Sequence, residues 1–214
     1  MLDVQVVLNG RNATAGDLAA SAQSLLRSVG TLELAHTDEE TVRVLWERFG
    51  ASVSAFEVLR PEVPLLVAPG GVVFAVGAVR RVVAQTEVPG RRVSRVFLPG
   101  LGPQEHLACW SASFLHSYQG SIAALVDADL AFDREHLSHS SPQARTWLPA
   151  HAVGVALTSE IGGDLARWSR RTGLALDARG VWTKSVRGPA GAVRRRLLRR
   201  RHRRQGAGVP RSLR

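Results

Sequence analysis

Apolar positions in the first sixty residues follow two different periods. Short runs rich in β-branched residues, at 4–8 (VQVVL), 31–36 (TLELAH) and 52–59 (SVSAFEVL), are typical of strands. Between them, 15–30 and 38–50 repeat apolar residues every three or four positions, which predicts two amphipathic helices. Strands that alternate with helices in this way favour a parallel sheet covered by helices, so the pattern predicts an α/β fold.

Residues at the ends of these two helices support the assignment. Gly30 stands where the first helix is expected to stop. Thr37 or Asp38 can cap the N-terminus of the second helix, and Gly50 can end it. One face of the second helix carries four apolar residues: Val42, Leu45, Trp46 and Phe49.

The remaining chain continues the alternation with less certain periods. Residues 63–85 predict an apolar strand, a Pro-Gly-Gly turn and a helix from about Val76, and 92–100 predict a strand. The segment 121–133 (SIAALVDADLAFD) fits a helix or a strand, and 147–173 predict a strand, a loop and a helix. Helical spacing relates four further residues: Leu107, Trp110, Phe114 and Leu115.

The net charge of +10 belongs to the C-terminal end. Residues 187–214 hold 11 arginines and no acidic residue, which leaves 17 basic against 18 acidic residues in 1–186. We therefore expect one domain over 1–186 followed by an arginine-rich tail. The tail can contact an anionic membrane surface, contact nucleic-acid phosphates or stay solvated, and all three interpretations stay open.

Cysteine and hydrophobic content bound the cellular setting. The single cysteine, Cys109, excludes a disulfide within the chain, fits a reducing compartment and is expected in the core. The five tryptophans are also expected in the core, although Trp147 and Trp182 stand near loops where a ring can stack on a sugar. The N-terminus lacks a secretion signal and no apolar run is long enough to span a membrane. We expect a cytoplasmic protein, with the tail as its only candidate contact to the inner face of the membrane.

Four motifs in order resemble those of inverting glycosyltransferases of family 2, which have the nucleotide-diphospho-sugar transferase (GT-A) fold. They are VVLNGRN (6–12), LELAHTDEETVRVLWERFG (32–50), LVAPGGVVFAVGAVRRVV (66–83) and AHAVGVALTSEIGGDLARW (150–168). The resemblance covers about residues 1–170 and implies a GT-A-like, Rossmann-like, mostly parallel sheet flanked by helices. It also implies transfer of a sugar from a nucleotide-sugar donor to a hydroxyl of a glycan or lipid-linked acceptor.

The resemblance assigns provisional roles to individual residues. Asn9, Arg11 and Asn12 would border the nucleotide, and Asp38 would be its acidic contact. Glu160 would be the general base that deprotonates the acceptor hydroxyl. The alternative is structural: Asn9 belongs only to a turn, and Asp38 only caps a helix.

The chain departs from the family at the metal site. Members place a metal-binding D-x-D motif at the end of the fourth strand, where this chain has Ala68-Pro69-Gly70. Only three residues, Arg-Pro-Glu, separate the third and fourth predicted strands, so the helix that normally joins them is expected to be missing. In one interpretation, the protein is a degenerate or metal-independent relative. In the other, 121–133 is the metal strand, and Asp127 and Asp129 bind Mn²⁺ or Mg²⁺. A third reading makes these two aspartates part of a solvated turn or helix face.

Three functions therefore stay open from the sequence. The chain is an inverting glycosyltransferase, a non-catalytic GT-A-like protein that binds a partner or glycan, or a nucleic-acid-binding protein that uses its basic tail.

Overall fold

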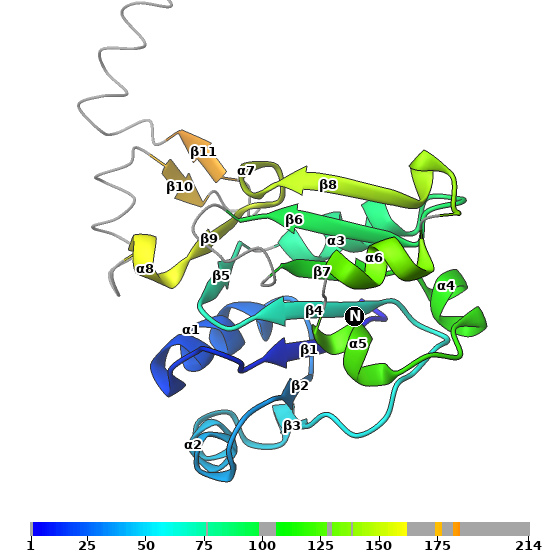
Figure 1. Cartoon of the computed structure of the whole chain (residues 1–214). Coiled ribbons are helices and arrows are strands. Elements are labelled where there is room, and N and C mark those ends of the chain that lie inside the picture. Colours follow the sequence, from blue (N-terminus) through cyan, green and yellow to red (C-terminus); the bar gives the residue numbers. More distant parts are fainter. Residues whose placement is uncertain are drawn as a thin grey trace, which may run out of the picture.

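The computed structural model describes the backbone of residues 2–75, 77–98, 106–127, 130–137, 139–161, 174–176 and 182–184 (Figure 1). Its centre is a seven-stranded sheet in the order β3-β2-β1-β4-β7-β6-β8. Strand β7 runs antiparallel to its neighbours β4 and β6, and every other pair in this sheet is parallel. The strands are β1 (Gln5–Asn9), β2 (Leu32–Ala35), β3 (Val53–Ala55), β4 (Leu65–Pro69), β6 (Val93–Phe97), β7 (Leu107–Trp110) and β8 (Arg145–Pro149). The α/β architecture predicted from the sequence, a mostly parallel sheet flanked by helices, is confirmed.

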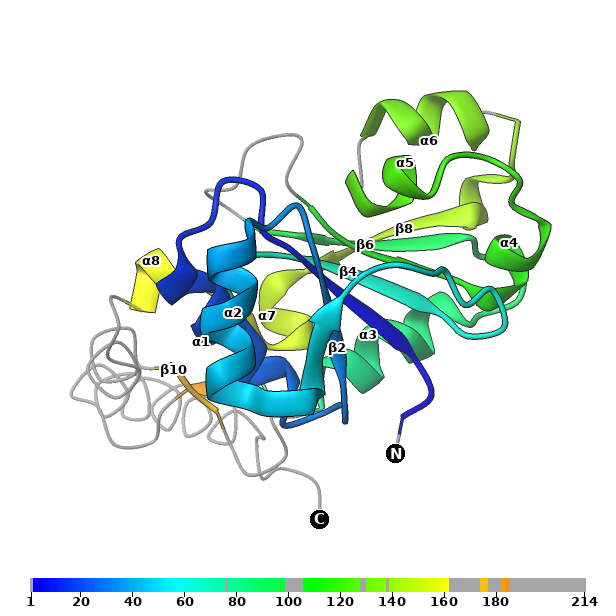
Figure 2. The ribbon, with the colours of Figure 1, turned by 90° about the horizontal axis from the view of Figure 1, so that it is seen from below.

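Helices cover both faces of this sheet. On one face lie α1 (Ala15–Leu25) and α3 (Ala78–Thr86), and on the other lies a layer of three short helices (Figures 1 and 2). The layer contains α4 (Ala112–Ser117), α5 (Ile122–Asp127) and α6 (Leu130–His136). The other helices are α2 (Glu39–Phe49), α7 (Ala150–Val153) and α8 (Thr158–Ile161), with 3₁₀ turns at Gly50–Ser52 and Pro142–Ala144. Two small antiparallel pairs join β5 (Val72–Phe74) to β9 (Val155–Leu157) and β10 (Leu174–Leu176) to β11 (Trp182–Lys184).

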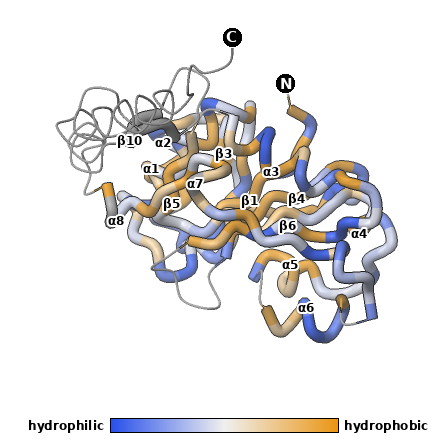
Figure 3. Tube along the Cα trace, turned by 90° about the horizontal axis from the view of Figure 1, so that it is seen from above, coloured by the Kyte–Doolittle hydropathy of each residue, from blue (hydrophilic) through white to orange (hydrophobic). Residues whose placement is uncertain are grey.

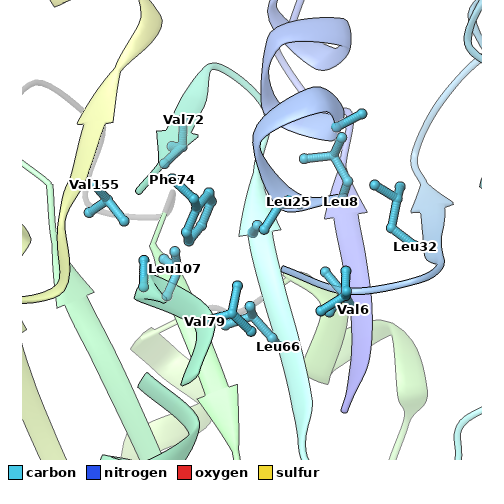
Figure 4. Close-up of a cluster of buried hydrophobic side chains, with 14 of the residues drawn as sticks. Val6, Leu8, Leu25, Leu32, Leu66, Val72, Phe74, Val79, Leu107 and Val155 are labelled. Carbon is cyan, nitrogen blue, oxygen red and sulfur yellow. The ribbon is translucent and has the colours of Figure 1, made fainter. Parts of the chain in front are cut away.

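Alternation along the strands builds one core on each face of the sheet. In β1, Val6 and Leu8 point toward α1, whereas Val7 joins the cluster beneath α4, α5 and α6. Figure 4 shows the larger cluster, in which Phe74 of β5 packs among side chains from the sheet and the helices. The hydrophobic colours of Figure 3 concentrate along β1, β4 and α5. Cys109 is fully buried, as predicted, and burial raises the pKa of its thiol to about 12.

Two serines on the buried face of α1 hold β5 in place. The backbone N–H of Val72 donates to Ser21 Oγ at 3.0 Å, and that of Phe74 donates to Ser24 Oγ at 3.0 Å. Two edge N–H groups that β9 does not pair are thereby satisfied inside the core. The polar residues within the apolar face of this helix are thus explained by the strand that packs against it.

The connection between β3 and β4 contains no helix, as the sequence predicts. Residues 56–64 form an irregular loop, and the buried amide of Gln5 in β1 binds it. Gln5 Nε2 donates to the carbonyl oxygen of Val58 at 2.7 Å, and Gln5 Oε1 accepts from the N–H of Arg60 at 2.9 Å. The Gln5 side chain therefore holds the loop that connects β3 to β4, where the connection contains no helix.

A fully buried ion pair attaches α6 to the sheet. Arg95 in β6 donates to both carboxylate oxygens of Asp133, from Nε at 2.9 Å and from Nη2 at 2.8 Å. Both side chains have no exposed surface, and the guanidinium lies 5.4 Å from the centroid of the Trp110 ring. Arg145 of β8 lies 3.3 Å from the same carboxylate. The pair is bidentate and shielded from water, so its geometry is fixed.

Several expectations about individual elements are wrong. Helix α1 ends at Leu25, well before Gly30, and the N–H of Ser28 then donates to the Leu25 carbonyl three residues back, which tightens the chain into a turn. Residues 107–110 form strand β7 and only the following residues are helical, so the helical spacing there was misleading. The strand interpretation of 121–133 is wrong, since α5 and α6 are helices.

The described tryptophan side chains differ in burial. Trp110 is buried, as expected, but Trp46 is 58% exposed and Trp147 is 41% exposed, so the core prediction is wrong for these two. Trp182 lies in β11, whose side chains are not described. Within the described part of the chain, no helix has the length and apolar character needed to cross a membrane. The arginine-rich segment 187–214 lies outside the described residues.

The buried pair generates a stability prediction. Asp133→Ala leaves the Arg95 charge buried without its bidentate partner, so we expect it to lower the free energy of unfolding by about 3–5 kcal/mol. The double variant Arg95→Met/Asp133→Leu removes both charges and is expected to recover most of this loss. Urea unfolding measures all three free energies.

Glu135→Ala is the matched control, because this exposed carboxylate lies on the same helix and its loss should cost less than about 0.5 kcal/mol. Equal costs for Asp133→Ala and Glu135→Ala would contradict the anchoring role of the pair.

Candidate functional site

The carboxyl ends of three parallel strands meet at one edge of the sheet. Asn9 of β1 is in register with Ala35 of β2 on one side and with Pro69 of β4 on the other. In an open α/β sheet this edge is the usual ligand crevice. The loops that follow β1 and β2 contain the two positive-φ residues other than glycine in the described chain, Asn12 (φ 62°) and His36 (φ 54°). Both loops therefore turn sharply at the edge.

Two glycines allow these loops to approach each other closely. A Cβ on Gly10 would overlap the Thr37 side chain after β2. A Cβ on Gly70 would overlap the Cβ of Ala13 and lie 2.9 Å from Leu18 Cδ2. The N–H of Gly70 also donates to the carbonyl oxygen of Asn9 at 2.8 Å. The end of β4 is thus packed directly against the loop after β1, without space for a larger residue.

Helix α5 brings a carboxylate to this edge. Trp110 Nε1 donates to the carbonyl oxygen of Leu125 at 3.2 Å, and Asn9 Nδ2 donates to that of Val126 at 3.1 Å. These carbonyls belong to the last turn of α5, where helix carbonyls lack partners within the helix. Two strands of the sheet therefore cap the C-terminus of α5, and the next residue, Asp127, is placed beside the loops after β1 and β2.

Asp127 lies between two potential cations. Its Oδ1 atom is buried and stands 3.0 Å from Arg11 Nη2 and 2.8 Å from His36 Nε2. Neither contact has the angles of a hydrogen bond, so the oxygen is held by charge and proximity. The Arg11 side chain is 51% exposed and that of Asp127 is 30% exposed. We call these three residues the edge cluster.

A pocket of about 830 Å³ opens on one side of the edge cluster. Its floor comes from the ends of β2 and β3, and its two walls come from α2 and α5. Trp46 and Phe56 contribute aromatic rings, and His36 of the edge cluster also lines it. The other lining residues are Leu34, Ala35, Thr37, Glu39, Val42, Arg43, Ala55, Glu57, Ile122, Ala123 and Val126. Its size and mostly apolar wall are typical of small-molecule sites.

A second pocket, of about 680 Å³, lies on the other side of the edge cluster. It is bounded by Arg11 and the start of α1, by the turn at 69–71 and by the start of α8. Arg11 lines this pocket and His36 lines the first, while both contact the same oxygen of Asp127. The edge cluster therefore stands between the two pockets.

The N-terminus of α1, inside the second pocket, is already occupied by a carboxylate of the chain. Thr14 Oγ1 accepts from the N–H of Asp17, and Asp17 Oδ2 accepts from the backbone N–H of Thr14 at 3.3 Å, which forms a capping box. The hydroxyl of Thr14 also donates to Asp17 Oδ2, at 2.7 Å. Asp17 Oδ1 also accepts from Thr158 Oγ1 at 2.8 Å. The hydrogen bonds from Thr14 and Thr158 lower the pKa of Asp17. This helix end therefore favours a link between α1 and α8 over a bound phosphate.

The residues predicted to border a nucleotide are distributed unevenly. Arg11 and Asn12 line the second pocket. Asn9 lines neither pocket: its amide oxygen accepts from the N–H of Arg11 and its nitrogen donates to α5, so its amide serves the fold. Asp38 is exposed and caps α2 by accepting from the N–H of Thr41, which lowers its pKa. Its N-cap role is confirmed, and its nucleotide contact stays a prediction.

The structure does not describe the side chains of two predicted carboxylates, Asp129 and Glu160. Asp129 lies outside the described residues. Glu160 belongs to helix α8, whose first residue is tied to α1 through Asp17, but its side chain is not described. Its role as a general base therefore stays a prediction.

The described residues do not form the divalent-metal site that the family resemblance implies, and binding of a metal by Asp127 and Asp129 stays a prediction because Asp129 lies outside them. Strand β4 ends in Ala68-Pro69, where the resemblance places the D-x-D motif, and this strand end carries no carboxylate. Gly70 cannot carry a larger side chain without displacing Ala13. The described residues contain no group of three or more metal-binding side chains, and Asp127 already faces Arg11 and His36.

Sequence reasoning missed two residues of the site, His36 and Trp46. His36 is the last residue of the predicted strand 31–36, a position that suggests no role in a site. Its left-handed backbone, which follows from the fold, brings it to Asp127. Trp46 was assigned to the core with the other apolar residues of α2. A large aromatic residue next to charged residues is the signal that points to it, because Arg43 lies three positions before Trp46 and pairs with Glu47, which directly follows it.

Comparison with known proteins gives likeness of architecture alone. No family model matches the chain, and no curated protein matches it. A cytidylyltransferase from Leptospira borgpetersenii is 9% identical, with a TM-score of 0.45 over 70% of this chain and 76% of its own. Glucosyl-3-phosphoglycerate synthase from Mycobacterium tuberculosis is 13% identical, with a TM-score of 0.46 over 69% of each chain. 4-Diphosphocytidyl-2C-methyl-D-erythritol synthase from Anaerococcus prevotii is 7% identical, with a TM-score of 0.45 over 79% and 96%. At these scores, the function has to be inferred from the residues of this chain.

The capping box predicts a specific acid dependence. The pKa of Asp17 is lowered from its ordinary value of 3.8, so its stabilisation is present above that value and is lost as the pH falls through the lower, folded-state value. Asp17→Asn is therefore expected to lower the melting temperature at about pH 6, and the gap to the unchanged protein should narrow toward about pH 3. Calorimetric melting across this range measures the gap, and a constant gap would contradict the assignment.

Proposed function

We propose that the protein binds a nucleotide-sugar and transfers its sugar to a hydroxyl of a glycan or lipid-linked acceptor. The observation that carries this proposal is the arrangement of two pockets on either side of one charged cluster at the carboxyl edge of the sheet. A nucleotide-sugar has the same three parts in the same order: a planar base with its ribose, a charged diphosphate and a polar ring.

The larger pocket suits the nucleoside. Trp46 and Phe56 offer aromatic surfaces on which a base can stack, and stacking is worth about 1–3 kcal/mol per base. Glu57 and Thr37 add polar groups at the rim that can bind ribose hydroxyls or base edges. Arg43 also lines this pocket, but Glu40 and Glu47 both bind its guanidinium, so it serves α2.

The smaller pocket suits the sugar. It lies beside the end of β4 and contains hydroxyl, amide and carboxylate groups that can bind sugar hydroxyls. Helix α8, which carries Glu160, begins at its wall. In this proposal, the carboxylate of Glu160 accepts the proton of the acceptor hydroxyl that attacks the sugar.

One observation favours a second function in which the chain binds the donor without transferring it. The end of β4 has no carboxylate, and the leaving diphosphate of the transfer reaction needs stabilisation by positive charge. The second candidate is therefore a non-catalytic nucleotide-sugar-binding protein. Measuring sugar transfer or donor hydrolysis in a sample that demonstrably binds the donor separates the two functions.

Donor binding is tested with Trp46→Ala. We expect this variant to bind the preferred nucleoside diphosphate, chosen from UDP, GDP, CDP and dTDP by titration calorimetry, roughly 5–150-fold more weakly, because stacking is lost. Folding should change little, because the ring is 58% exposed in the free protein.

Trp147→Ala is the matched control, since Trp147 is also partly exposed but lies on β8, away from the pocket. No binding of any nucleoside diphosphate at millimolar concentration would remove both functions. If the two substitutions weakened nucleoside diphosphate binding equally, the nucleoside would not be bound in the larger pocket.

Catalysis is tested with Glu160→Gln. If Glu160 is the general base, the variant should lose about 10²–10⁴-fold in turnover while its donor affinity stays unchanged. Glu135→Gln, which makes the same change at an exposed carboxylate of α6 that lines neither pocket, is the control. Turnover is measured as nucleoside diphosphate released in the presence of an acceptor mixture. Undiminished release by Glu160→Gln would exclude this residue as the base.

A further inference from the structure

We propose that the chain binds the diphosphate of its ligand without a divalent metal, by transferring the Arg11 guanidinium from Asp127 to the phosphate oxygens. This inference rests on the proposed nucleotide function and concerns the chemistry of the same site. It is based on two positions at the carboxyl edge: Arg11 supplies positive charge in the loop after β1, and the end of β4, where the family holds its metal, carries no carboxylate.

The positive charge comes from the loop after β1. Arg11 stands between the two pockets, where the diphosphate of a bound nucleotide-sugar would pass. A guanidinium binds phosphate oxygens through two parallel N–H donors, whereas a metal needs carboxylates to hold it. His36 Nε2, 2.8 Å from the same carboxylate oxygen, is placed to donate a hydrogen bond to an anion there.

Asp127 keeps Arg11 in position while the site is empty. Its Oδ1 atom is buried and faces both Arg11 and His36, so the free protein already holds an anionic oxygen at the point where a phosphate oxygen would sit. Water reaches Arg11, which is 51% exposed, so an ion pair of this kind contributes little and can be exchanged. A diphosphate carries more negative charge than one carboxylate and is therefore the stronger partner.

The packing also opposes a metal at the position the family uses. Gly70 is closed in by Ala13 and Leu18, and Pro69 lies in register with Asn9 inside the sheet. A carboxylate at this turn would push apart β4 and the loop after β1. That loop carries Arg11, so the close packing that excludes the metal motif is also what places the guanidinium at the edge.

The test measures affinity of the full chain for the best-binding nucleoside diphosphate and for its parent nucleoside, in EDTA and in Mn²⁺. We expect the two buffers to give affinities within about twofold. Arg11→Gln should weaken the diphosphate at least about tenfold and leave the nucleoside nearly unchanged. Asp127→Asn should bind the diphosphate as well as the unchanged protein or several-fold more tightly, because its competitor for Arg11 is neutral.

Arg80→Gln is the control, because it removes the same charge from the exposed surface of α3 on the far face of the sheet. Melting curves establish that each variant is folded. Binding that requires Mn²⁺ and disappears in Asp127→Asn would overturn the inference while leaving the proposed function intact, and would make Asp127 a metal ligand. Equal weakening of nucleoside and diphosphate by Arg11→Gln would also overturn it. Failure of every nucleoside diphosphate to bind in either buffer would overturn the proposed function together with the inference.

Discussion

The buried ion pair between Arg95 and Asp133 is the contact on which the α4–α6 face of the molecule depends. It holds α6 against β6, and its guanidinium lies over Trp110. The indole of Trp110 in turn binds the last turn of α5, which ends at Asp127. Charge buried in this way is expensive unless both partners are present, so α6 has one position on the sheet. The placement of a carboxylate at the carboxyl edge therefore begins with a salt bridge in the core.

Close packing of backbone sets the chemistry at that edge. Gly10 and Gly70 draw the loop after β1 against the loop after β2 and against the end of β4. A side chain at either glycine would overlap its neighbours. The same arrangement places Arg11 next to Asp127. The charges that remain at the edge come from residues far apart in the chain, each supplied by a different element. Positive charge is fixed by the fold here, whereas a metal site would have to be assembled from acidic side chains.

Local pattern predicted the first half of the fold well, because β1, β2 and α2 show clear periods and strong end signals such as Asp38 and Gly50. It failed at β7, where Leu107 and Trp110 are three apart, as in a helix, but are pinned as a strand by antiparallel pairing with β4 and β6. Helix α5 was ambiguous because six residues cannot display a period. The edge cluster was beyond prediction, since Arg11 and Asp127 meet only through β1, β7 and α5, and no local rule brings together residues so distant in sequence.

The short loop between β3 and β4 determines which residues form part of the wall of the larger pocket. Because Gln5 fixes this loop in place of a helix, the end of β3 stays uncovered, and Phe56 and Glu57 become part of the wall of the larger pocket. Most of that wall is apolar, and its arginine is held by its own helix. Enzymes discriminate strongly between similar ligands when buried polar groups are left unpaired by the wrong one, and weakly when only apolar surface is in contact. If this pocket binds a nucleoside, as proposed, such a wall would accept purine and pyrimidine rings on similar terms, and selectivity among nucleotides would depend on the few polar groups at its rim.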